Sequence, residues 1–187
     1  LIKGIYDFLD QEGFIKIDAP ILTPNACEGT TELFEMEYFD QKAYLSQSGQ
    51  LYIEAAIFSH RKVFDFGPVF RAEKSKTRRH LTEFWMMDAE VAFATHDDNI
   101  ALQEQLIVYL VQKILTSNMS ELVILERDVE SLRKVTAPFI RKTHAEVVKE
   151  LQGLGSDIKE GEDLGGDDET LLTQKYEKPI FVEKYPA

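Results

Sequence analysis

The residues with the clearest chemical potential lie in one short stretch of the chain. Six side chains that are or can become positively charged fall within ten residues: Arg71, Lys74, Lys76, Arg78, Arg79 and His80. The chain as a whole is acidic, with 33 Asp and Glu against 21 Lys and Arg. Because such a concentration stands out in an acidic protein, we predict an anion site here, and in particular a site for the phosphates of a nucleotide.

The residue types around this stretch suit nucleotide binding. Arg71 is expected at the end of a strand, where its planar guanidinium suits bidentate contact with a phosphate better than a lysine would. Phe84, near the start of the returning strand, could stack on a purine base. Glu73 could accept from an exocyclic amine, and His80 could reach distal phosphates. The same residues also fit a hairpin with a charged loop and core-facing aromatics, and the sequence leaves both interpretations open.

A second group of polar residues follows a proline-rich passage. Residues 47–50 read Gln-Ser-Gly-Gln and open an expected helix. Glu28 and Gln50 would lie at element ends beside apolar segments, where a substrate ammonium group could bind. Glu54, one turn into the helix, could face the same cavity, although glutamates on helix surfaces are usually just solvated.

Several common kinds of site find no support in the sequence. Neither the glycine-rich P-loop pattern nor the Rossmann glycine pattern occurs, and no Cys/His cluster suggests zinc, so no metal site is expected within these residues. The histidines have no serine or cysteine partner at a suitable spacing for a nucleophile triad. The single cysteine, Cys27, excludes an internal disulfide framework, fits a reducing cytosol and is expected to be buried.

Length and composition indicate a globular protein. With 187 residues, of which 44% are hydrophobic, the chain can bury a substantial core as one domain or as one domain with a fragment of another. No apolar run is long enough to span a membrane. The net charge of −12 argues against nucleic-acid binding through the whole surface, so such contact must be local. The N-terminus lacks an initiator Met and a signal-peptide pattern, so we expect the chain to be part of something longer.

The elements that must position these residues follow from hydrophobic periodicity. We expect helices at residues 1–12, 51–59, 97–116 and 145–151, the last two capped by Asp97/Asp98 and by Thr143. Strands are expected at residues 14–17, 32–38, 43–46, 62–71, 82–93 and 179–183. The acidic run 157–169 is expected to be a solvated loop. Helices interspersed with hairpins, without regular β-α-β alternation, predict an α+β fold on an antiparallel sheet.

The motifs in these elements resemble those of the class II aminoacyl-tRNA synthetases, in their aspartate/asparagine/lysine subgroup. The family's first motif, which forms a dimer interface, is similar to the initial helix and strand that end at Pro20 and Pro24. Its second motif is matched by Phe-Arg-Ala-Glu at 70–73, by the basic loop of residues 74–79, and by Arg-His-Leu-Thr-Glu-Phe at 79–84. The resemblance covers essentially the whole chain and implies the class II catalytic fold, an antiparallel sheet flanked by helices.

For ATP, the resemblance implies a role for each residue of the second motif. Arg71 is implied to bind the α-phosphate and to be the catalytic residue, and His80 to approach the terminal phosphates. Glu73 is implied to lie on the adenine side of the site, with Phe84 stacked on the base. Magnesium is implied as well, with its ligands expected beyond Ala187.

For the other substrates, the resemblance implies that Glu28 and Gln50 hold the α-ammonium group of the amino acid. At the positions that match residues 48–54, the aspartate enzymes of the subgroup have a sequence similar to Ser-Pro-Gln-Leu-Tyr-Lys-Gln. Ile53 replaces the lysine and Glu54 follows it, so an amide that donates to Glu54 is favoured over a carboxylate. The asparagine branch of the subgroup is therefore expected. The tRNA acceptor end is implied to meet Lys74, Lys76, Arg78 and Arg79.

The resemblance also marks departures from the family pattern. The third motif, a Gly-rich segment ending in an ATP-clamping arginine, and the anticodon-binding barrel are absent, so residues 1–187 are expected to be a partial catalytic domain that is inactive alone. The implied activity of the intact enzyme, a cytoplasmic homodimer, is ATP-dependent ligation of asparagine to tRNA(Asn) through asparaginyl-adenylate. Open alternatives are an aspartyl-tRNA synthetase, a synthetase-derived asparagine synthetase and a non-catalytic synthetase-like binding module.

Overall fold

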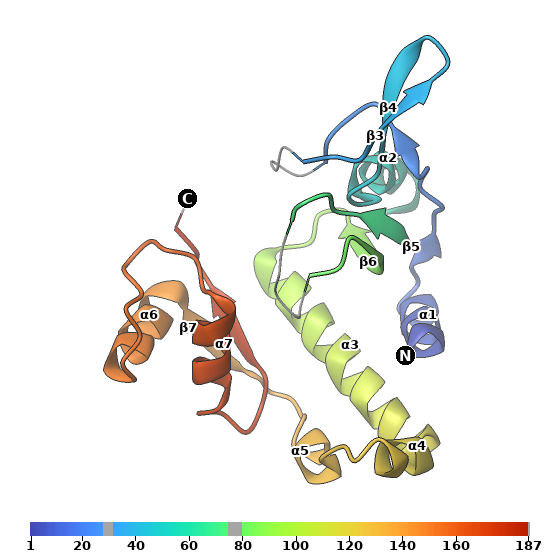
Figure 1. Ribbon diagram of the computed structural model, residues 1–187. Helices are drawn as coiled ribbons and strands as arrows, with labels where there is room; N and C mark the ends of the chain where they lie inside the picture. Colours follow the sequence, from blue (N-terminus) through green and yellow to red (C-terminus); the bar gives the residue numbers. More distant parts are fainter. Residues whose placement is uncertain (28–31, 75–79, 187) are drawn as a thin grey trace. The chain divides into compact units, whose positions relative to one another are not determined.

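The computed structural model describes residues 1–27, 32–74 and 80–186, which form two compact units. The N-terminal unit is Tyr6–Thr95, and the C-terminal unit is His96–Ala187 together with Leu1–Ile5. Figure 1 shows small sheets and helices within each unit, which confirms the expected α+β class. The expectation of a single partial catalytic domain stays a prediction.

The N-terminal unit is built on a long hairpin. Strands β5 (Lys62–Phe70) and β6 (Glu83–Val91) pair antiparallel along their whole lengths, with Lys62 opposite Val91 and Phe70 opposite Glu83. Strand β1 (Ile15–Lys16) pairs in parallel with the other edge of β5. Because side chains alternate between the two faces of a strand, the hairpin presents one face to helix α1 and the other to helix α2.

Helix α1 (Ile2–Gln11) packs on the first face through aromatic contacts. The ring of Tyr6 lies edge-on to Phe64 and to Phe66, with ring centroids 5.7 Å apart in both pairs, and Phe66 contacts Trp85. After the helix, Gly13 adopts φ 78, the left-handed conformation that glycine accepts without strain. This turn directs the chain from α1 into β1.

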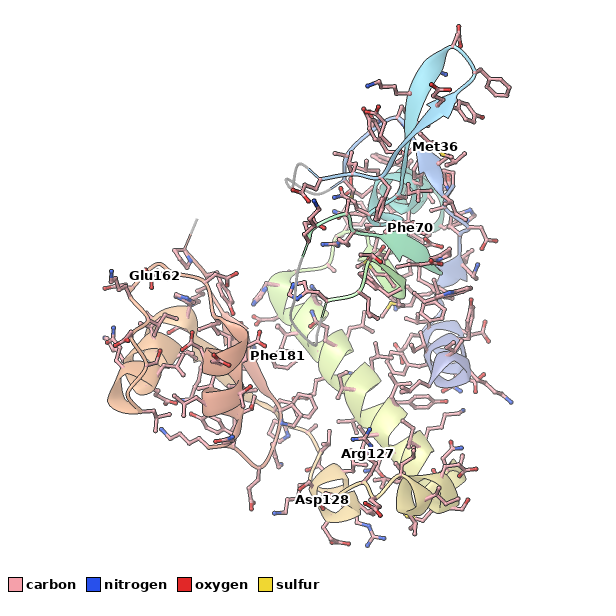
Figure 2. All side chains as sticks on the ribbon, in the orientation of Figure 1. Met36, Phe70, Arg127, Asp128, Glu162 and Phe181 are labelled. Atoms are coloured by element: carbon pink, nitrogen blue, oxygen red, sulfur yellow. The ribbon has the colours of Figure 1, made fainter. Side chains whose placement is uncertain are left out.

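Helix α2 (Gln50–His60) packs on the second face, where Ile53, Val63 and Val69 are buried. A separate antiparallel sheet precedes it, in the order β2 (Leu22–Thr23), β4 (Gln41–Leu45) and β3 (Glu35–Tyr38). Its β3–β4 hairpin carries Met36, which is labelled in Figure 2. The predicted pair at residues 32–38 and 43–46 is therefore confirmed, with slightly different ends.

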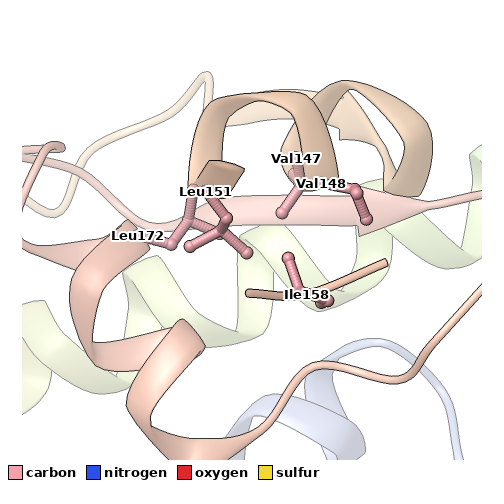
Figure 3. Packing of buried hydrophobic residues seen from close by; sticks show 5 residues of the cluster. All are labelled: Val147, Val148, Leu151, Ile158 and Leu172. Carbon is pink, nitrogen blue, oxygen red and sulfur yellow. The ribbon is translucent and has the colours of Figure 1, made fainter. Parts of the chain in front are cut away.

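The C-terminal unit contains five helices and two strands in its described residues. These are α3 (His96–Ser117), α4 (Met119–Ile124), α5 (Val129–Arg133), β7 (Ile140–Thr143), α6 (His144–Gly153), α7 (Gly166–Thr173) and β8 (Ile180–Glu183). Strands β7 and β8 pair in parallel. Figure 3 shows the core beside them, made by Val147, Val148, Leu151, Ile158 and Leu172.

Predicted helix ends in this unit are partly confirmed. Thr143 caps α6 as expected, since its hydroxyl accepts from the Glu146 N–H and the Glu146 carboxylate accepts from the Thr143 N–H. The predicted cap at Asp97/Asp98 is wrong, because α3 begins at His96 and both carboxylates lie inside its first turn. There they interact favourably with the positive end of the helix dipole.

The prediction of a solvated loop over residues 157–169 is also partly wrong. Helix α7 begins at Gly166, so Asp167, Asp168 and Glu169 form its first turn. The carboxylate of Asp168 accepts from the Gly165 N–H at 3.2 Å. A dense acidic run thus starts a helix here, because carboxylates are favourable at a helix N-terminus.

A charged network connects α3, β7 and β8 within the C-terminal unit. Glu183 is only 8% exposed and accepts two hydrogen bonds from Arg141, from Nε at 2.6 Å and from Nη2 at 2.7 Å. Arg141 also pairs with Asp97 at 2.7 Å, and His96 Nε2 lies 2.6 Å from Glu183 Oε2. The hydrogen bonds from Arg141, followed by the contact with His96, lower the pKa of Glu183 to about 2.

Acidification should weaken this network. The pKa of Glu183 falls from its ordinary 4.5 to about 2 on folding, so its stabilisation is fully present above about pH 4.5 and is lost as the pH drops toward 2. We expect Glu183→Gln to lower Tm near neutral pH, and to lose less Tm than the wild type on acidification to about pH 3, because the amide does not titrate. Thermal unfolding at both pH values measures this. Glu160→Gln, at an exposed position, is the control, and equal losses in Glu183→Gln and wild type would contradict the expectation.

Candidate active site

The candidate site is organised around a buried polar turn at residues 46–49, between β4 and α2. Ser46, Gln47 and Ser48 are each at most 5% exposed, so their polar groups need partners within the protein. The N–H of Phe70 donates to the Ser46 carbonyl at 2.8 Å, and the Ser46 hydroxyl donates to the Ser48 carbonyl at 2.6 Å. The turn is thereby tied to the end of β5, where Phe70 is labelled in Figure 2.

Arg71 lies directly after β5 and contacts this turn. Its N–H donates to the carbonyl of Thr82 at 3.0 Å, which continues the β5–β6 ladder by one residue. Its Nη2 donates to the Gln47 carbonyl in a long hydrogen bond of 3.5 Å. Glu73 follows and is half-buried, with its Oε1 inaccessible to solvent. The structure therefore places the predicted phosphate ligand at the strand end, on the α2 face of the hairpin.

Strand β6 adds Phe84, Met86, Asp88 and Glu90 to that face, because residues two apart point the same way. Phe84 is half-buried and lies opposite Val69. Asp88 accepts two hydrogen bonds on its Oδ2, from the Ser48 hydroxyl at 2.8 Å and from the Gly49 N–H at 3.0 Å. Glu90 completes the row. The predicted base-stacking residue and the acceptor for the turn thus share one side of one strand.

The first turn of α2 brings together two other predicted residues. Gln50 is the first residue of α2, and its Nε2 donates to Glu54 Oε1 at 2.8 Å. The Sγ of Cys27 lies 3.8 Å from Gln50 Oε1. Cys27 is half-buried, so the expectation of a buried thiol is wrong. Gln50 and Glu54, predicted to face one cavity, are in direct contact.

Carboxylates dominate the electrostatics of this face. Burial raises the pKa of Asp65, and the charge of Asp88 raises it further, while two backbone N–H groups and the Lys16 ammonium act in the opposite direction. Burial also raises the pKa of Glu90, with additional contributions from Glu54 and then Asp88. Such surroundings favour a cationic group, such as a substrate ammonium, and disfavour a further carboxylate.

The other predicted site residues are exposed or lie outside the described residues. Lys74 and His80 are exposed, as are Pro20 and Pro24 on either side of β2. The remaining candidates lie outside the described residues, and their roles stay predictions: Glu28, Lys76, Arg78 and Arg79.

Sequence reasoning assigned no role to Ser48, Gly49, Asp65 or Asp88, although all four meet at the start of α2. The only signal in the sequence was the alternation of two acidic residues, Asp88 and Glu90, near the end of β6. The position of Asp65 opposite Asp88 follows from the register of the hairpin, which the sequence does not state.

Magnesium, which the resemblance implies, finds no complete ligand set in the part of the chain that the structure describes. There, no three His, Cys, Asp or Glu side chains are grouped so as to hold a metal ion. Within the same residues, no helix combines the length and apolar character needed to cross a membrane.

The charge of Glu54 should be detectable at Glu90. Since Glu54 raises the pKa of Glu90, we expect Glu54→Gln to lower that pKa toward its ordinary value of 4.5. Titration of the side-chain carboxyl carbon by NMR measures the change. Glu37→Gln on the exposed strand β3 should leave it unchanged. A Glu90 titration that is the same in Glu54→Gln and wild type would show that the two carboxylates do not interact.

Three comparisons with known proteins agree on the family. The family described as tRNA synthetases class II (D, K and N) matches residues 1–187. An asparagine–tRNA ligase from Pelotomaculum thermopropionicum is 51% identical over 187 residues, which is 100% of this chain and 44% of that protein.

Two solved structures are also similar to the chain. The asparaginyl-tRNA synthetase from Pyrococcus horikoshii, complexed with asparaginyl-adenylate, matches with a TM-score of 0.96 and 42% identity, over 99% of this chain and 43% of that one. The aspartyl-tRNA synthetase from Entamoeba histolytica matches with a TM-score of 0.76 and 29% identity, over 100% of this chain and 36% of that one. The chain therefore spans less than half the length of each of these relatives.

Proposed function

Since the chain belongs to the class II tRNA synthetases of the D, K and N group, we propose that the full-length protein joins asparagine to tRNA(Asn) by using ATP. The observation that carries this proposal is the 51% identity with an asparagine–tRNA ligase along the whole chain. Here the full-length protein denotes a protein as long as these relatives that contains this chain.

In the proposed first step, an α-carboxylate oxygen of asparagine attacks the α-phosphorus of ATP. The bond from that phosphorus to pyrophosphate breaks, which leaves asparaginyl-adenylate. Arg71 donates to the α-phosphate oxygens as negative charge develops there. A hydroxyl of the terminal ribose of the tRNA then attacks the acyl carbon and releases AMP. Catalysis depends on holding the reacting groups in line, and no protein nucleophile is required.

The proposed amino-acid site uses Gln50 and Glu28 for the α-ammonium group and Glu54 for the side-chain amide. The 2.8 Å contact between Gln50 and Glu54 supports a shared site. Ile53, where the aspartate pattern has lysine, is fully buried and supplies no cation for a substrate carboxylate. The carboxylates of Glu54 and Glu90 would repel the side chain of aspartate, which favours asparagine.

The proposed ATP site consists of Arg71, Glu73, His80 and Phe84. Its support is the position of Arg71 and Phe84 on the same face of the β5–β6 hairpin, at the end where Phe70 pairs with Glu83. The basic loop is proposed to meet the acceptor end of the tRNA through Lys74, Lys76, Arg78 and Arg79.

The full-length protein is further proposed to be a cytoplasmic homodimer that pairs through the segment around β2. Ile15, Ile21 and Leu22 are 36% to 44% exposed, close in sequence to Pro20 and Pro24, and apolar side chains at a surface are typical of an interface. The cytoplasmic location is supported by the single cysteine in the sequence.

Arg71→Ala in the full-length protein should lower asparagine-dependent exchange of pyrophosphate into ATP by about two orders of magnitude or more, which is the scale of losing one transition-state donor. Lys42→Ala, on the exposed β3–β4 hairpin, is the matched cationic control and should exchange like the wild type. Arg71→Ala within a few-fold of the wild type would contradict the role of Arg71. Wild-type exchange that depends on aspartate instead of asparagine would contradict the proposed function.

A further inference from the structure

Two aspartates of the β5–β6 hairpin lie against the 46–49 turn, and the proposed chemistry uses neither of them. Asp65 on β5 lies opposite Asp88 on β6, so both carboxylates project from the α2 face. Both are close to Gly49, the residue immediately before α2. The turn connects them to Gln50, the residue proposed to bind the amino acid.

Asp88 holds the turn by hydrogen bonds. One oxygen, Oδ2, accepts from the Ser48 hydroxyl at 2.8 Å and from the Gly49 N–H at 3.0 Å. The hydroxyl oxygen of Ser48 in turn accepts from the Gln50 N–H at 3.1 Å. Two of these three hydrogen bonds therefore link β6 to the first residue of α2 through the Ser48 hydroxyl. Because Ser48 is only 3% exposed, water has little access to replace these bonds.

Asp65 restricts the turn by its volume. A Cβ atom at position 49 would lie 2.2 Å from Asp65 Oδ2, 2.9 Å from its Cγ and 3.0 Å from its Cβ. Asp65 is 7% exposed on the central strand, so its carboxylate has little room to move aside. Position 49 therefore needs a glycine because of this close approach, and any larger residue must displace either the turn or Asp65.

We propose that Asp88 and Asp65 are positioning residues for the amino-acid site, which fix the turn so that Gln50 and Glu54 face the substrate correctly. This inference rests on the proposed function. Asp88 acts as an acceptor of two hydrogen bonds, and Asp65 acts as the wall against which Gly49 packs. Neither carboxylate touches the substrate in this role.

Displacement of the turn has a defined kinetic consequence. Gln50 is proposed to hold the ammonium group of asparagine in the ground state and in the transition state alike, so its displacement raises KM for asparagine with little effect on kcat. A purely structural role for Asp88 would instead lower thermal stability and the active fraction of the enzyme, with KM for asparagine unchanged.

The test measures pyrophosphate exchange by the full-length protein against asparagine and ATP concentrations. Asp88→Ala should raise KM for asparagine about 30-fold, the scale expected for lost hydrogen bonds to a charged group, with kcat and KM for ATP within about threefold of wild type. Asp88→Asn should stay within about threefold in all three constants, because its amide oxygen can take the place of Oδ2. Asp40→Ala, in the exposed turn between β3 and β4, is the matched control.

A second pair of variants tests Asp65. Gly49→Ala should raise KM for asparagine about tenfold or more, since it forces the turn away from Asp65. Adding Asp65→Ala removes the carboxyl atoms nearest the new Cβ, so the double variant should have a lower KM for asparagine than Gly49→Ala alone. A double variant no better than Gly49→Ala would overturn the role of Asp65.

Asp88→Asn as damaging as Asp88→Ala would show that Asp88 acts by its charge, and an unchanged KM in Asp88→Ala would show that it does not position the site. If Asp88→Ala does not fold, Ser48→Ala should still raise KM for asparagine about fivefold, and an unchanged KM there would overturn the inference. Absence of asparagine-dependent exchange in the wild type would overturn the proposed function itself, which separates the two failures.

Discussion

The antiparallel pairing of β5 with β6 is the constraint on which the rest of the N-terminal unit depends. Its register sets Asp65 opposite Asp88 and Val69 opposite Phe84. Because side chains alternate, a slip of one residue would turn Phe84, Asp88 and Glu90 to the α1 face. Buried side chains on both faces oppose such a slip, since Val63 packs under α2 while Phe64 contacts Tyr6 of α1. The hydrophobic core thus fixes the positions of the polar residues.

The same register separates two kinds of charge along one hairpin. Carboxylates gather where β5 and β6 lie against the start of α2, and Arg71 lies directly after the end of β5. An amino acid presents an ammonium group and ATP presents phosphates, so a site that joins them needs both environments close to one another. The 46–49 turn spans the two, because Gln47 accepts from Arg71 while Ser48 donates to Asp88.

Periodicity in the sequence predicted the long elements correctly, because β5, β6, α2 and α3 each contain enough residues to show their pattern. Strands as short as β2, with two residues, carry no detectable alternation. The roles of Ser48, Gly49 and Asp65 could not be predicted, since they depend on contacts between residues far apart in the chain. Family resemblance supplied Arg71 and Gln50 as candidates, but it did not indicate what holds them in place.

The proposed function requires that the α2 face of the β5–β6 hairpin binds an asparaginyl group in preference to an aspartyl group. Calorimetry of the full-length protein with a non-hydrolysable asparaginyl-adenylate analogue and with its aspartyl counterpart tests this most directly, because the two ligands differ only in the side-chain amide. We expect the asparaginyl analogue to bind about 100-fold more tightly or better, since the aspartyl carboxylate would face Glu54 without a cation. Equal affinity, or tighter binding of the aspartyl analogue, would contradict the proposed preference for an asparaginyl group.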